Sequence, residues 1–516
     1  MRNMVKWFCL TIWGLITCCS SVLAQVDTVY FAVTMPHREQ HKINVSMRFS
    51  ATSRDYVDIR MPVWSPGYYQ TLNYPEKVSD FAAQTAEGAA LHWERLGQDG
   101  WRIFSDDMAE VTLRYTVLAD RPFVATSYVD ANRAFIKPAG VFMYIDGQLQ
   151  RPARVSVTPP LPWPDIATGL DTVSGESAIF EAADFDILYD SPILIGELRA
   201  LPPFEVGGAE HRFIGYGMST DFDDAALMGD IRKIVREATT IIGEIPYAHY
   251  TFIGIGPGQG GIEQLNSTAI SFTGEGLDGP GRLQTLSFIA HEYFHHYNVK
   301  RIRPIELGPF DYSRPNRTNL LWVAEGLTVY YENVLLHRAG LMTGQQVLDD
   351  WAAVIANLEN NPGRFKQTLA ASSWNTWEDG PFGKPGETIS YYVKGPVIAM
   401  LLDIEIRHAT ANKRSLDDVM RKLYIDYYKD ARRGFTEAEV QTVCEAIAGK
   451  PLDEIFDYIY TVKEIDYASY FAKAGLDVEF DTTQRKDGQP QLKVSIKPVA
   501  NPDGPARRVR QGLLGQ

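Results

Sequence analysis

The chain has 516 residues, with 64 acidic and 50 basic side chains and a formal net charge of −14. So acidic a chain has no electrostatic attraction for nucleic acid or anionic membranes, and neither is expected as a partner. The length exceeds what one hydrophobic core organises, so we expect several domains. A hydrophobic fraction of 45% and a charged fraction of 22% are typical of a folded soluble protein.

The N-terminus has the pattern of a secretory signal peptide. Arg2 and Lys6 precede an apolar stretch over residues 7–19, which is too short to span a membrane comfortably. Val22 and Ala24 then occupy the −3 and −1 positions of a cleavage site. We therefore expect secretion across the inner membrane, a periplasmic or extracellular mature protein, and no membrane insertion after cleavage.

Short runs of β-branched and aromatic residues predict an all-β region before residue 200. Turn signals such as Ser65-Pro66-Gly67 separate the runs, and many of them alternate apolar with polar residues. Regular short strands of this kind indicate a β-sandwich. The predicted strands cover residues 26–33, 43–49, 57–62, 101–104, 111–117 and 153–157.

Beyond residue 200 the pattern becomes mixed and then mainly helical. We expect a helix over 221–242, strands over 250–255 and 268–272, and helices from 283 to 474 broken by loops at 303–317 and 372–387. The fold class is therefore α+β and multidomain. The predicted domains are a signal peptide over 1–24, a β-sandwich over 25–200, a catalytic domain over 201–475 and a short β-rich segment over 476–516.

The stretch His291-Glu292-Tyr293-Phe294-His295 is a candidate metal-binding and catalytic motif. Residues four apart lie on one face of a helix, so both imidazoles can bind one ion while Glu292 lies beside it. A zinc ion in such a site lowers the pKa of a bound water, and the glutamate accepts its proton. The alternative is a pair of ordinary histidines on an unrelated helix.

A catalytic zinc needs a third protein ligand, and Glu325 in the apolar helical run 320–331 can supply it. Glu332, two turns further along, is the competing carboxylate and could instead support a ligand. A favourable charge near a helix N-terminus is the alternative role for Glu325. Since Cys444 is the single cysteine of the mature chain, a cysteine-rich structural zinc site is excluded. We expect one zinc ion per chain, on His291, His295 and Glu325.

Several stretches together resemble the glycyl aminopeptidases, metallopeptidase family sixty-one. The resemblance covers about residues 26–475 and implies a gluzincin, with an N-terminal β-sandwich followed by a thermolysin-like, mainly helical zinc-peptidase domain. The stretches that carry it are Pro62-Val-Trp-Ser-Pro-Gly67, Ala134-Phe-Ile-Lys-Pro138, Gly260-Gly-Ile-Glu263, His291-Glu-Tyr-Phe-His295, Asn298-Val-Lys-Arg-Ile-Arg-Pro304, Trp322-Val-Ala-Glu-Gly326, Arg338-Ala-Gly340, Ser390-Tyr-Tyr-Val-Lys-Gly395 and Ser415-Leu-Asp-Asp-Val-Met420.

The resemblance also implies roles for individual residues. Gly260 and Gly261 let the substrate backbone approach, and Glu263 binds the free α-amino group of a peptide. Tyr392 donates a hydrogen bond to the developing oxyanion, with Tyr391 as the alternative donor. The implied activity is removal of small N-terminal residues, glycine or alanine. A glycine-rich turn and simple core packing are the structural alternatives for these residues.

Two other functions remain open at the level of sequence. One is an endopeptidase with the same zinc chemistry, and the other is a peptide-binding protein with a vestigial zinc site. His296 should point away from the face of His291 and His295. The basic cluster Lys300-Arg301-Ile302-Arg303 could reach a substrate carboxylate, or pair with acids such as Glu306. Many family members continue into a PDZ-like domain, and residues 476–516 could be part of one. The oligomeric state is unknown.

Overall fold

The computed structural model describes residues 27–51, 55–105, 110–484 and 488–515. The expected signal peptide over 1–24 lies outside these ranges. No helix in the described part of the chain is long and apolar enough to cross a membrane.

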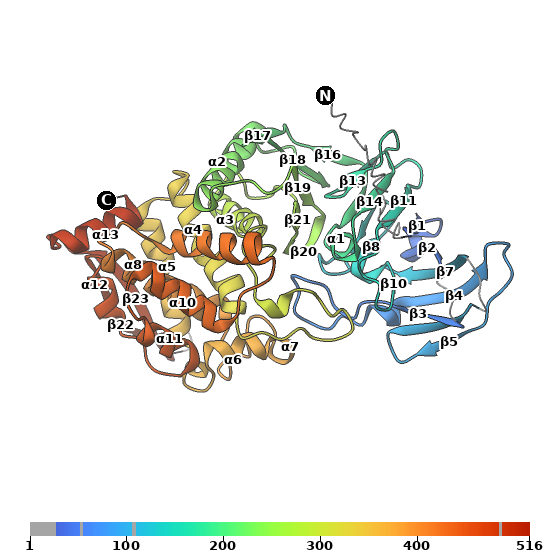
Figure 1. Ribbon diagram of the computed structural model, residues 1–516. Helices are drawn as coiled ribbons and strands as arrows, with labels where there is room; N and C mark the ends of the chain where they lie inside the picture. The colour runs from blue at the N-terminus through green and yellow to red at the C-terminus, as the bar shows by residue number, and fades with distance from the viewer. Residues whose placement is uncertain (1–26, 52–54, 106–109, 485–487, 516) are drawn as a thin grey trace, which may run out of the picture.

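Three sheets share one core in the N-terminal domain, on the right of Figure 1. The largest has the order β13-β14-β11-β1-β2-β7-β4, and β1 pairs parallel to β11 but antiparallel to β2. Alternate side chains of β2 are buried, as the predicted period of two requires. The strands of the largest sheet are β1 (Val29–Thr34), β2 (Lys42–Ser50), β4 (Val78–Thr85), β7 (Glu110–Leu118), β11 (Ala153–Thr158), β13 (Asp171–Thr172) and β14 (Ile179–Ala182).

Two four-stranded sheets complete this domain. Their orders are β10-β3-β6-β5 and β12-β15-β9-β8. The predicted β-rich domain is confirmed, and each of its six expected strands has a counterpart. The remaining strands are β3 (Tyr56–Arg60), β5 (Trp93–Leu96), β6 (Gly100–Phe104), β8 (Tyr128–Val129), β9 (Arg133–Ile136), β10 (Tyr144–Ile145), β12 (Asp165–Thr168) and β15 (Ile193–Gly196).

A further sheet stands between the β-rich domain and the helices (Figure 1). Its order is β16-β18-β19-β21-β20, with β17 also paired to β18, and β20 is its edge strand. The pairing of β20 with β21 shifts register between Gly256 and Gly261, so the edge is bulged where the glycines gather. The bounds are β16 (Leu198–Ala200), β17 (Phe204–Val206), β18 (Ala209–Tyr216), β19 (His249–Gly254), β20 (Gly256–Glu263) and β21 (Ser267–Phe272).

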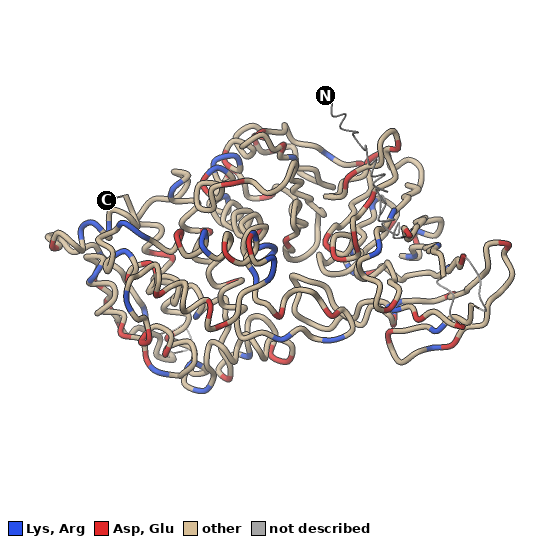
Figure 2. The backbone as a smooth tube through the Cα atoms, in the orientation of Figure 1, with Lys and Arg blue, Asp and Glu red and all other residues tan. Residues whose placement is uncertain are grey.

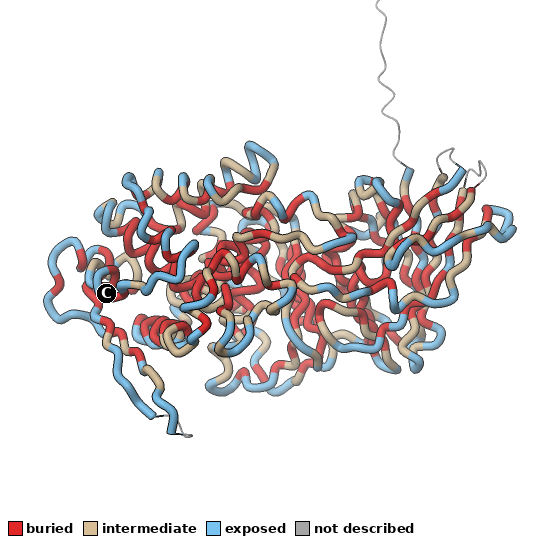
Figure 3. Tube along the Cα trace, turned by 90° about the horizontal axis from the view of Figure 1, so that it is seen from below, coloured by how far each residue is buried: buried red, intermediate tan, exposed pale blue. Residues whose placement is uncertain are grey.

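The remainder is mainly helical, as predicted. Buried runs follow the inner helices in Figure 3, and α8 is buried along most of its length because its sequence is apolar on all sides. The longer elements are α2 (Asp224–Ile242), α3 (Gly281–Phe294), α4 (Leu327–Arg338), α5 (Gly344–Glu359), α8 (Tyr391–Ala409), α9 (Leu416–Leu423), α10 (Glu437–Ala448) and α11 (Asp453–Tyr460), with π-helical turns η5 (Trp322–Gly326) and η7 (Tyr424–Ala431).

Three local expectations need correction. The helix expected to reach residue 299 ends at Phe294, where the chain turns tightly. The region 372–387, expected to be a loop, contains the end of α6 (Leu369–Trp374) and α7 (Thr376–Asp379). The C-terminal segment forms the expected hairpin of β22 (Leu476–Gln484) and β23 (Pro490–Pro498), whose far end extends from the body in Figure 3.

The third correction concerns the residues after that hairpin. They form a helix, α13 (Gly504–Leu514), and not further β-structure. Asp503 caps it by accepting a hydrogen bond from the Ala506 amide at 2.7 Å, and a proline stands in its first turn. The start signal was therefore present in the sequence. α13 packs against α8.

The loop at 303–317 joins the two halves of the molecule. Tyr312 enters the core of the N-terminal domain, where its ring lies 4.8 Å from that of Tyr189 and its hydroxyl donates to Asp186 at 2.5 Å. Trp64 donates in return to the Asp311 carbonyl at 2.9 Å. Because these contacts are buried and reciprocal, the two domains meet over a fixed interface.

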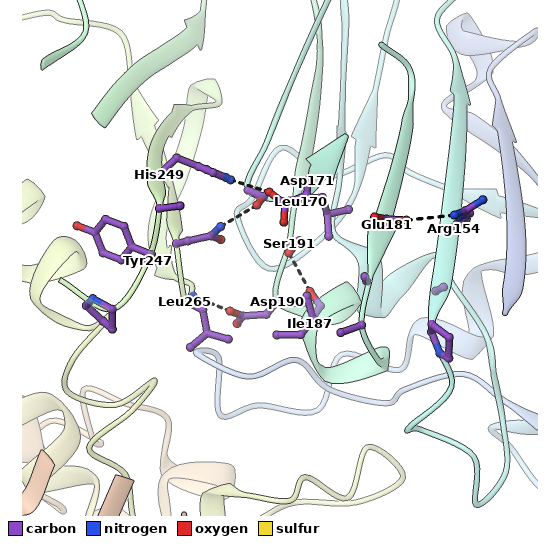
Figure 4. Close-up of a pocket in the computed structure, with 18 of the residues that line it drawn as sticks. Arg154, Leu170, Asp171, Glu181, Ile187, Asp190, Ser191, Tyr247, His249 and Leu265 are labelled. Carbon is purple, nitrogen blue, oxygen red and sulfur yellow. Dashed lines mark hydrogen bonds and ion pairs between the residues drawn. The ribbon is translucent and has the colours of Figure 1, made fainter. Parts of the chain in front are cut away.

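A cavity of about 550 Å³ also lies in this interface (Figure 4). Asp190 borders it and accepts a hydrogen bond from the Leu265 amide at 2.6 Å, and it forms an ion pair with Lys300. His249 and Asp171 bridge the two domains at 3.0 Å.

Two glycines let η5 and α8 touch backbone to backbone. A Cβ on Gly395 would lie 2.7 Å from the Gly326 Cα and 3.2 Å from the Trp322 carbonyl oxygen. A Cβ on Gly326 would lie 2.5 Å from the Gly395 Cα. No side chain fits between these segments, so the glycines set how closely they approach.

Gly395→Ala should therefore lower the midpoint of thermal unfolding, because the helices must separate. Overpacking of this kind costs about 1–3 kcal/mol. Gly229→Ala is the matched control, since it also lies inside a helix and a Cβ there meets nothing within 4 Å. The control should gain about 0.5–1 kcal/mol from helix propensity. Equal midpoints for the wild type and Gly395→Ala would contradict the close contact.

Candidate metal and catalytic site

Three buried side chains converge at the centre of the molecule. α3 carries His291, and His295 follows directly after the last residue of this helix; the Nε2 atoms of the two histidines lie 3.0 Å apart. Glu325 on η5 places its Oε2 3.1 Å from the His295 Nε2 and 3.7 Å from the His291 Nε2. One ligand atom from each of the three residues lies within 4.8 Å of the other two. The structure thus brings together the three residues that the sequence predicted as metal ligands.

The hydrogen bonds of the two imidazoles show that this cluster fits a cation. His295 donates from Nδ1 to the Asn298 carbonyl at 2.7 Å, and His291 Nδ1 lies 3.3 Å from the Glu332 carboxylate. Both acceptors place the ring proton on Nδ1, so the two Nε2 lone pairs face each other. The Glu325 Oε2 is buried and has no hydrogen-bond partner among the described residues. Two nitrogens and one carboxylate oxygen are a suitable donor set for zinc.

Electrostatics support the same interpretation of Glu325. Burial alone would favour its neutral acid, but His295 and His291 hold the pKa of Glu325 well below its usual range. The carboxylate is 1% exposed, so it keeps its charge through its neighbours and not through solvent. Glu332 supports His291 from outside the cluster, which is the supporting role that the sequence left open for it.

Asn298 holds the two ligand-bearing segments together. The π-helical turn that carries Glu325 frees backbone carbonyls from the regular helical ladder. The Asn298 side chain donates to the backbone carbonyls of Val323 at 2.8 Å and Ala324 at 3.1 Å, while the backbone carbonyl of Asn298 accepts from His295. One buried residue therefore orients a histidine and supports the turn before the glutamate.

Glu292 lies beside the three converging groups. Its carboxylate is buried, and Oε2 has no hydrogen-bond partner among the described residues. Burial raises the pKa of Glu292 to about 7, although His291 and His295 oppose the shift. A Cβ on Gly261 would lie only 2.3 Å from the Glu292 Oε1, so the glycine backbone lies directly against this carboxylate. A carboxylate with these properties can exchange a proton near neutral pH.

Glu263 ends the edge strand β20. It is 3% exposed, and its Oε1 has no partner among the described residues. Gly67, from the N-terminal domain, packs so closely that a Cβ there would lie 2.9 Å from the Glu263 Oε2. Its φ of +85° is also one that favours glycine. Gly260, with a φ of +79°, packs in turn against Phe123 and Val124 of the N-terminal domain.

Two further residues of the N-terminal domain lie close to Glu263. Tyr69 is buried, and burial together with the charges of Glu325 and Glu263 raises the pKa of its phenol. Lys137 is fully buried, and burial lowers the pKa of its ammonium to about 8, against the effect of Asp190 and Glu263. The N-terminal domain therefore closes one side of the site.

The two adjacent tyrosines have different surroundings. Tyr391 is buried, and its hydroxyl pairs with that of Thr376 at 3.1 Å. The Tyr392 ring lies 6.2 Å from that of His291, and the pKa of its phenol is raised by burial and by the negative charge of Glu325. The structure thus brings Tyr392 to the cluster and gives Tyr391 a packing role.

The sequence did not identify every residue of the site. Asn298, Gly67, Tyr69 and Lys137 received no individual role. Three of them lie in stretches that carried the family resemblance, and this was the available signal. The contacts of Gly67, Tyr69 and Lys137 depend on the docking of one domain on another, and those of Asn298 on the packing of η5 beside the end of α3, which no local pattern reports.

Two expectations about neighbouring residues can also be compared with the structure. His296 lies away from the cluster among tyrosine rings, the nearest being Tyr297 at 3.7 Å, and burial lowers the pKa of its imidazole. Glu306 does not pair with the basic cluster, because it accepts from Thr318 at 3.0 Å, while Lys300 pairs with Asp190.

Known protein families and structures are similar to this chain in sequence and fold. Residues 30–197 match the Peptidase M61 N-terminal domain, and residues 284–398 match the M61 glycyl aminopeptidase model. A crystal structure of an aminopeptidase N family protein from Idiomarina loihiensis superposes with a TM-score of 0.84 at 25% identity, covering 90% of this chain and 81% of that one. No curated protein sequence matches the chain.

More distant structures share the fold. The M1 zinc metallopeptidase from Deinococcus radiodurans has a TM-score of 0.54 at 14% identity, over 86% of this chain and 95% of that one. A variant of that enzyme, bound to a Tyr-Ser-Ala substrate, has a TM-score of 0.55 at 15% identity, over the same shares of the two chains. The family resemblance and the α+β, gluzincin-type fold are therefore confirmed, and the chain belongs to the M61 glycyl aminopeptidase family of zinc metallopeptidases.

Proposed function

We propose that this enzyme removes small N-terminal residues, glycine or alanine, from peptides, with one zinc ion per chain held by His291, His295 and Glu325. The observation that carries the exopeptidase assignment is Glu263, a buried carboxylate beside Glu292 and Gly261 whose Oε1 has no hydrogen-bond partner among the described residues. A carboxylate in this position binds the free ammonium of a peptide through a charge-assisted hydrogen bond. The signal-peptide pattern of residues 1–24 supports a periplasmic or extracellular place of action.

The size of the space near Glu263 supports small N-terminal residues. A cavity of about 50 Å³ lies beside Glu263, Gly67 and Tyr69. Gly67 packs directly on the Glu263 carboxylate, so no larger space exists between the two. Little room therefore remains on the side of Glu263 that faces Gly67, which favours a hydrogen or methyl side chain at the substrate's N-terminus.

Zinc, when bound, supplies Lewis-acid polarisation of the scissile carbonyl and acidifies the attacking water. Glu292 accepts the proton of that water and transfers it to the departing amine. Tyr392 donates a hydrogen bond to the oxygen on which negative charge develops. Glu263 binds the ammonium, and the edge of β20 with Gly260 and Gly261 aligns the peptide backbone.

Glu292→Gln should keep the fold and the metal but lower kcat for alanine arylamides by about a hundredfold or more, because the amide cannot accept a proton. Glu275→Gln, at an exposed glutamate, is the control and should be unaffected. Steady-state kinetics and the zinc content of each variant measure the effect. Full activity in zinc-loaded Glu292→Gln would contradict the assigned role.

Glu263→Gln tests whether Glu263 binds the free N-terminus of the substrate. Loss of the ammonium partner should lower kcat/KM for free-amine substrates about tenfold to a hundredfold. N-acetylated substrates lack the ammonium, so their slow hydrolysis should change little. The measurement is the ratio of kcat/KM for alanine and N-acetylalanine arylamides. An equal loss for both would indicate an endopeptidase, and no hydrolysis of any peptide by the zinc-loaded wild type would indicate a peptide-binding protein.

Asn298→Ala should weaken zinc binding about tenfold to a hundredfold, because the carbonyls of Val323 and Ala324 lose their donor and the ligand segments loosen. Asn319→Ala is the control, since that side chain bonds Glu437 instead. Titration with a competing chelator measures both affinities, and the wild type should hold one zinc per chain. Unchanged affinity in Asn298→Ala would show that Asn298 supports only the fold.

A further inference from the structure

A basic cavity of about 520 Å³ lies beside the loop that follows α3. The proposed zinc and substrate residues do not line it. Most of its lining comes from two segments far apart in the sequence, the loop after α3 and the end of η7, where Lys and Arg gather in Figure 2, and Asp186 and Leu265 complete it. Its cationic lining consists of Lys300, Arg301, Arg303, Lys429, Arg432 and Arg433. This concentration of positive charge contrasts with a net charge of −14 for the chain.

Half of these cations are neutralised by neighbouring acids. The pairs are Lys300 with Asp190, Lys429 with Glu244 at 2.7 Å, and Arg433 with Glu439 at 2.6 Å. Arg301, Arg303 and Arg432 form no ion pair with any acid in the described part of the chain. Asp186 is the one acid that lines the cavity, so the lining keeps an excess of about two positive charges.

Arg301 shows that this excess is built into the structure. It is 5% exposed, and its guanidinium donates to the carbonyls of Leu265 at 3.0 Å, His296 at 2.6 Å and Pro246 at 3.3 Å. Its Nε has no partner among the described residues. Carbonyl oxygens hold a guanidinium in place but do not cancel its charge. A buried guanidinium in this state is costly unless an anion joins it.

The larger cavity at the domain interface differs in this respect (Figure 4). There Arg154 faces Glu181 at 3.4 Å, the His249 Nε2 lies 3.0 Å from Asp171, and Asp190 lines the cavity together with Arg301. The acids of this lining are at least as many as its Lys and Arg side chains, so it has no excess of positive charge. Arg301 borders both cavities, but of the two only the basic cavity has a cationic lining.

We propose that the basic cavity binds a phosphate-type dianion, either inorganic phosphate or the phosphate group of a small phosphomonoester. Planar guanidiniums bind two oxygens of one phosphate at once, and a dianion matches the excess charge of the lining. Chloride satisfies neither condition, and a monocarboxylate can bind a guanidinium through two oxygens but carries only one negative charge. Binding of the anion would influence the loop that holds His295, because Arg301 donates to the His296 carbonyl within that loop.

Isothermal titration of the zinc-loaded enzyme with inorganic phosphate tests this proposal. We expect saturable binding with a Kd of about 1 mM or tighter, and a higher thermal unfolding midpoint in phosphate. Arg303→Gln/Arg432→Gln should weaken binding about tenfold or more with zinc content unchanged, and the single variant Arg432→Gln, whose side chain lies away from Glu263, should also leave peptidase activity unchanged. Arg232→Gln, an exposed arginine on α2, is the control and should bind as the wild type does. The single variant Arg432→Gln serves if the double variant folds poorly.

Glycerol 3-phosphate, titrated in parallel, distinguishes the source of the phosphate. Tighter binding of either probe, lost in the double variant, supports the site and identifies its preferred ligand. Binding that persists in the double variant would place the phosphate elsewhere, for example on the zinc, and would overturn the proposal. Absence of saturable binding up to about 20 mM would do the same, as would equal competition by acetate at matched ionic strength.

Discussion

The rest of the structure depends on one unfavourable arrangement, the convergence of two imidazole lone pairs and a carboxylate at a buried point. The two Nε2 atoms lie 3.0 Å apart, and the Glu325 Oε2 has no hydrogen bond to relieve its charge. Groups of this kind repel one another unless a cation lies between them. The protein must therefore hold them in place by other contacts, and these contacts account for much of the local architecture.

Those contacts come from backbone geometry as much as from side chains. Asn298 ties the end of α3 to the π-helical turn of Glu325, and the Gly326–Gly395 contact brings α8 against that turn. Since α8 begins at Tyr391, the same contact determines where Tyr392 lies relative to Glu325. A single close approach of two glycines thus couples the third ligand to the proposed oxyanion donor. Specific supporting contacts of this kind hold the side chains of the site in precise positions.

Local periodicity made part of this site predictable from the sequence. Two histidines four residues apart share a helix face, so their convergence follows from helix geometry alone. Glu325 followed from the need for a third ligand and from the family resemblance. Tyr391 and Tyr392 were not separable in this way, because adjacent helical residues differ only in direction, and the partner Thr376 comes from another helix. The α13 helix was missed although its cap was visible, because a preceding hairpin suggested more β-structure.

The contribution of the N-terminal domain was beyond the reach of sequence patterns. Gly67, Tyr69 and Lys137 reach Glu263 only because the β-rich domain docks against the edge of β20. These three residues come close to Glu263 only in the folded protein, and their positions in the sequence follow no period and no fixed spacing. The sequence left open whether the basic cluster reaches a substrate carboxylate or pairs with acids such as Glu306, and Lys300 does pair with an acid, although a different one. Neighbours in sequence were considered, whereas the actual partner of Lys300, Asp190, comes from the other domain.

The docked domain also explains how a fold shared with other zinc peptidases can act on one end of a chain. An endopeptidase needs a groove open on both sides of the scissile bond. Here Gly67 packs onto the Glu263 carboxylate, and Tyr69 and Lys137 lie around it, so a longer peptide meets protein where an endopeptidase would offer space. In the proposed function, the charge of Glu263 then selects an ammonium over a further peptide bond, since a neutral amide would leave the buried carboxylate unpaired. Steric closure and an unpaired carboxylate act together, and neither alone would distinguish a free N-terminus from the interior of a peptide.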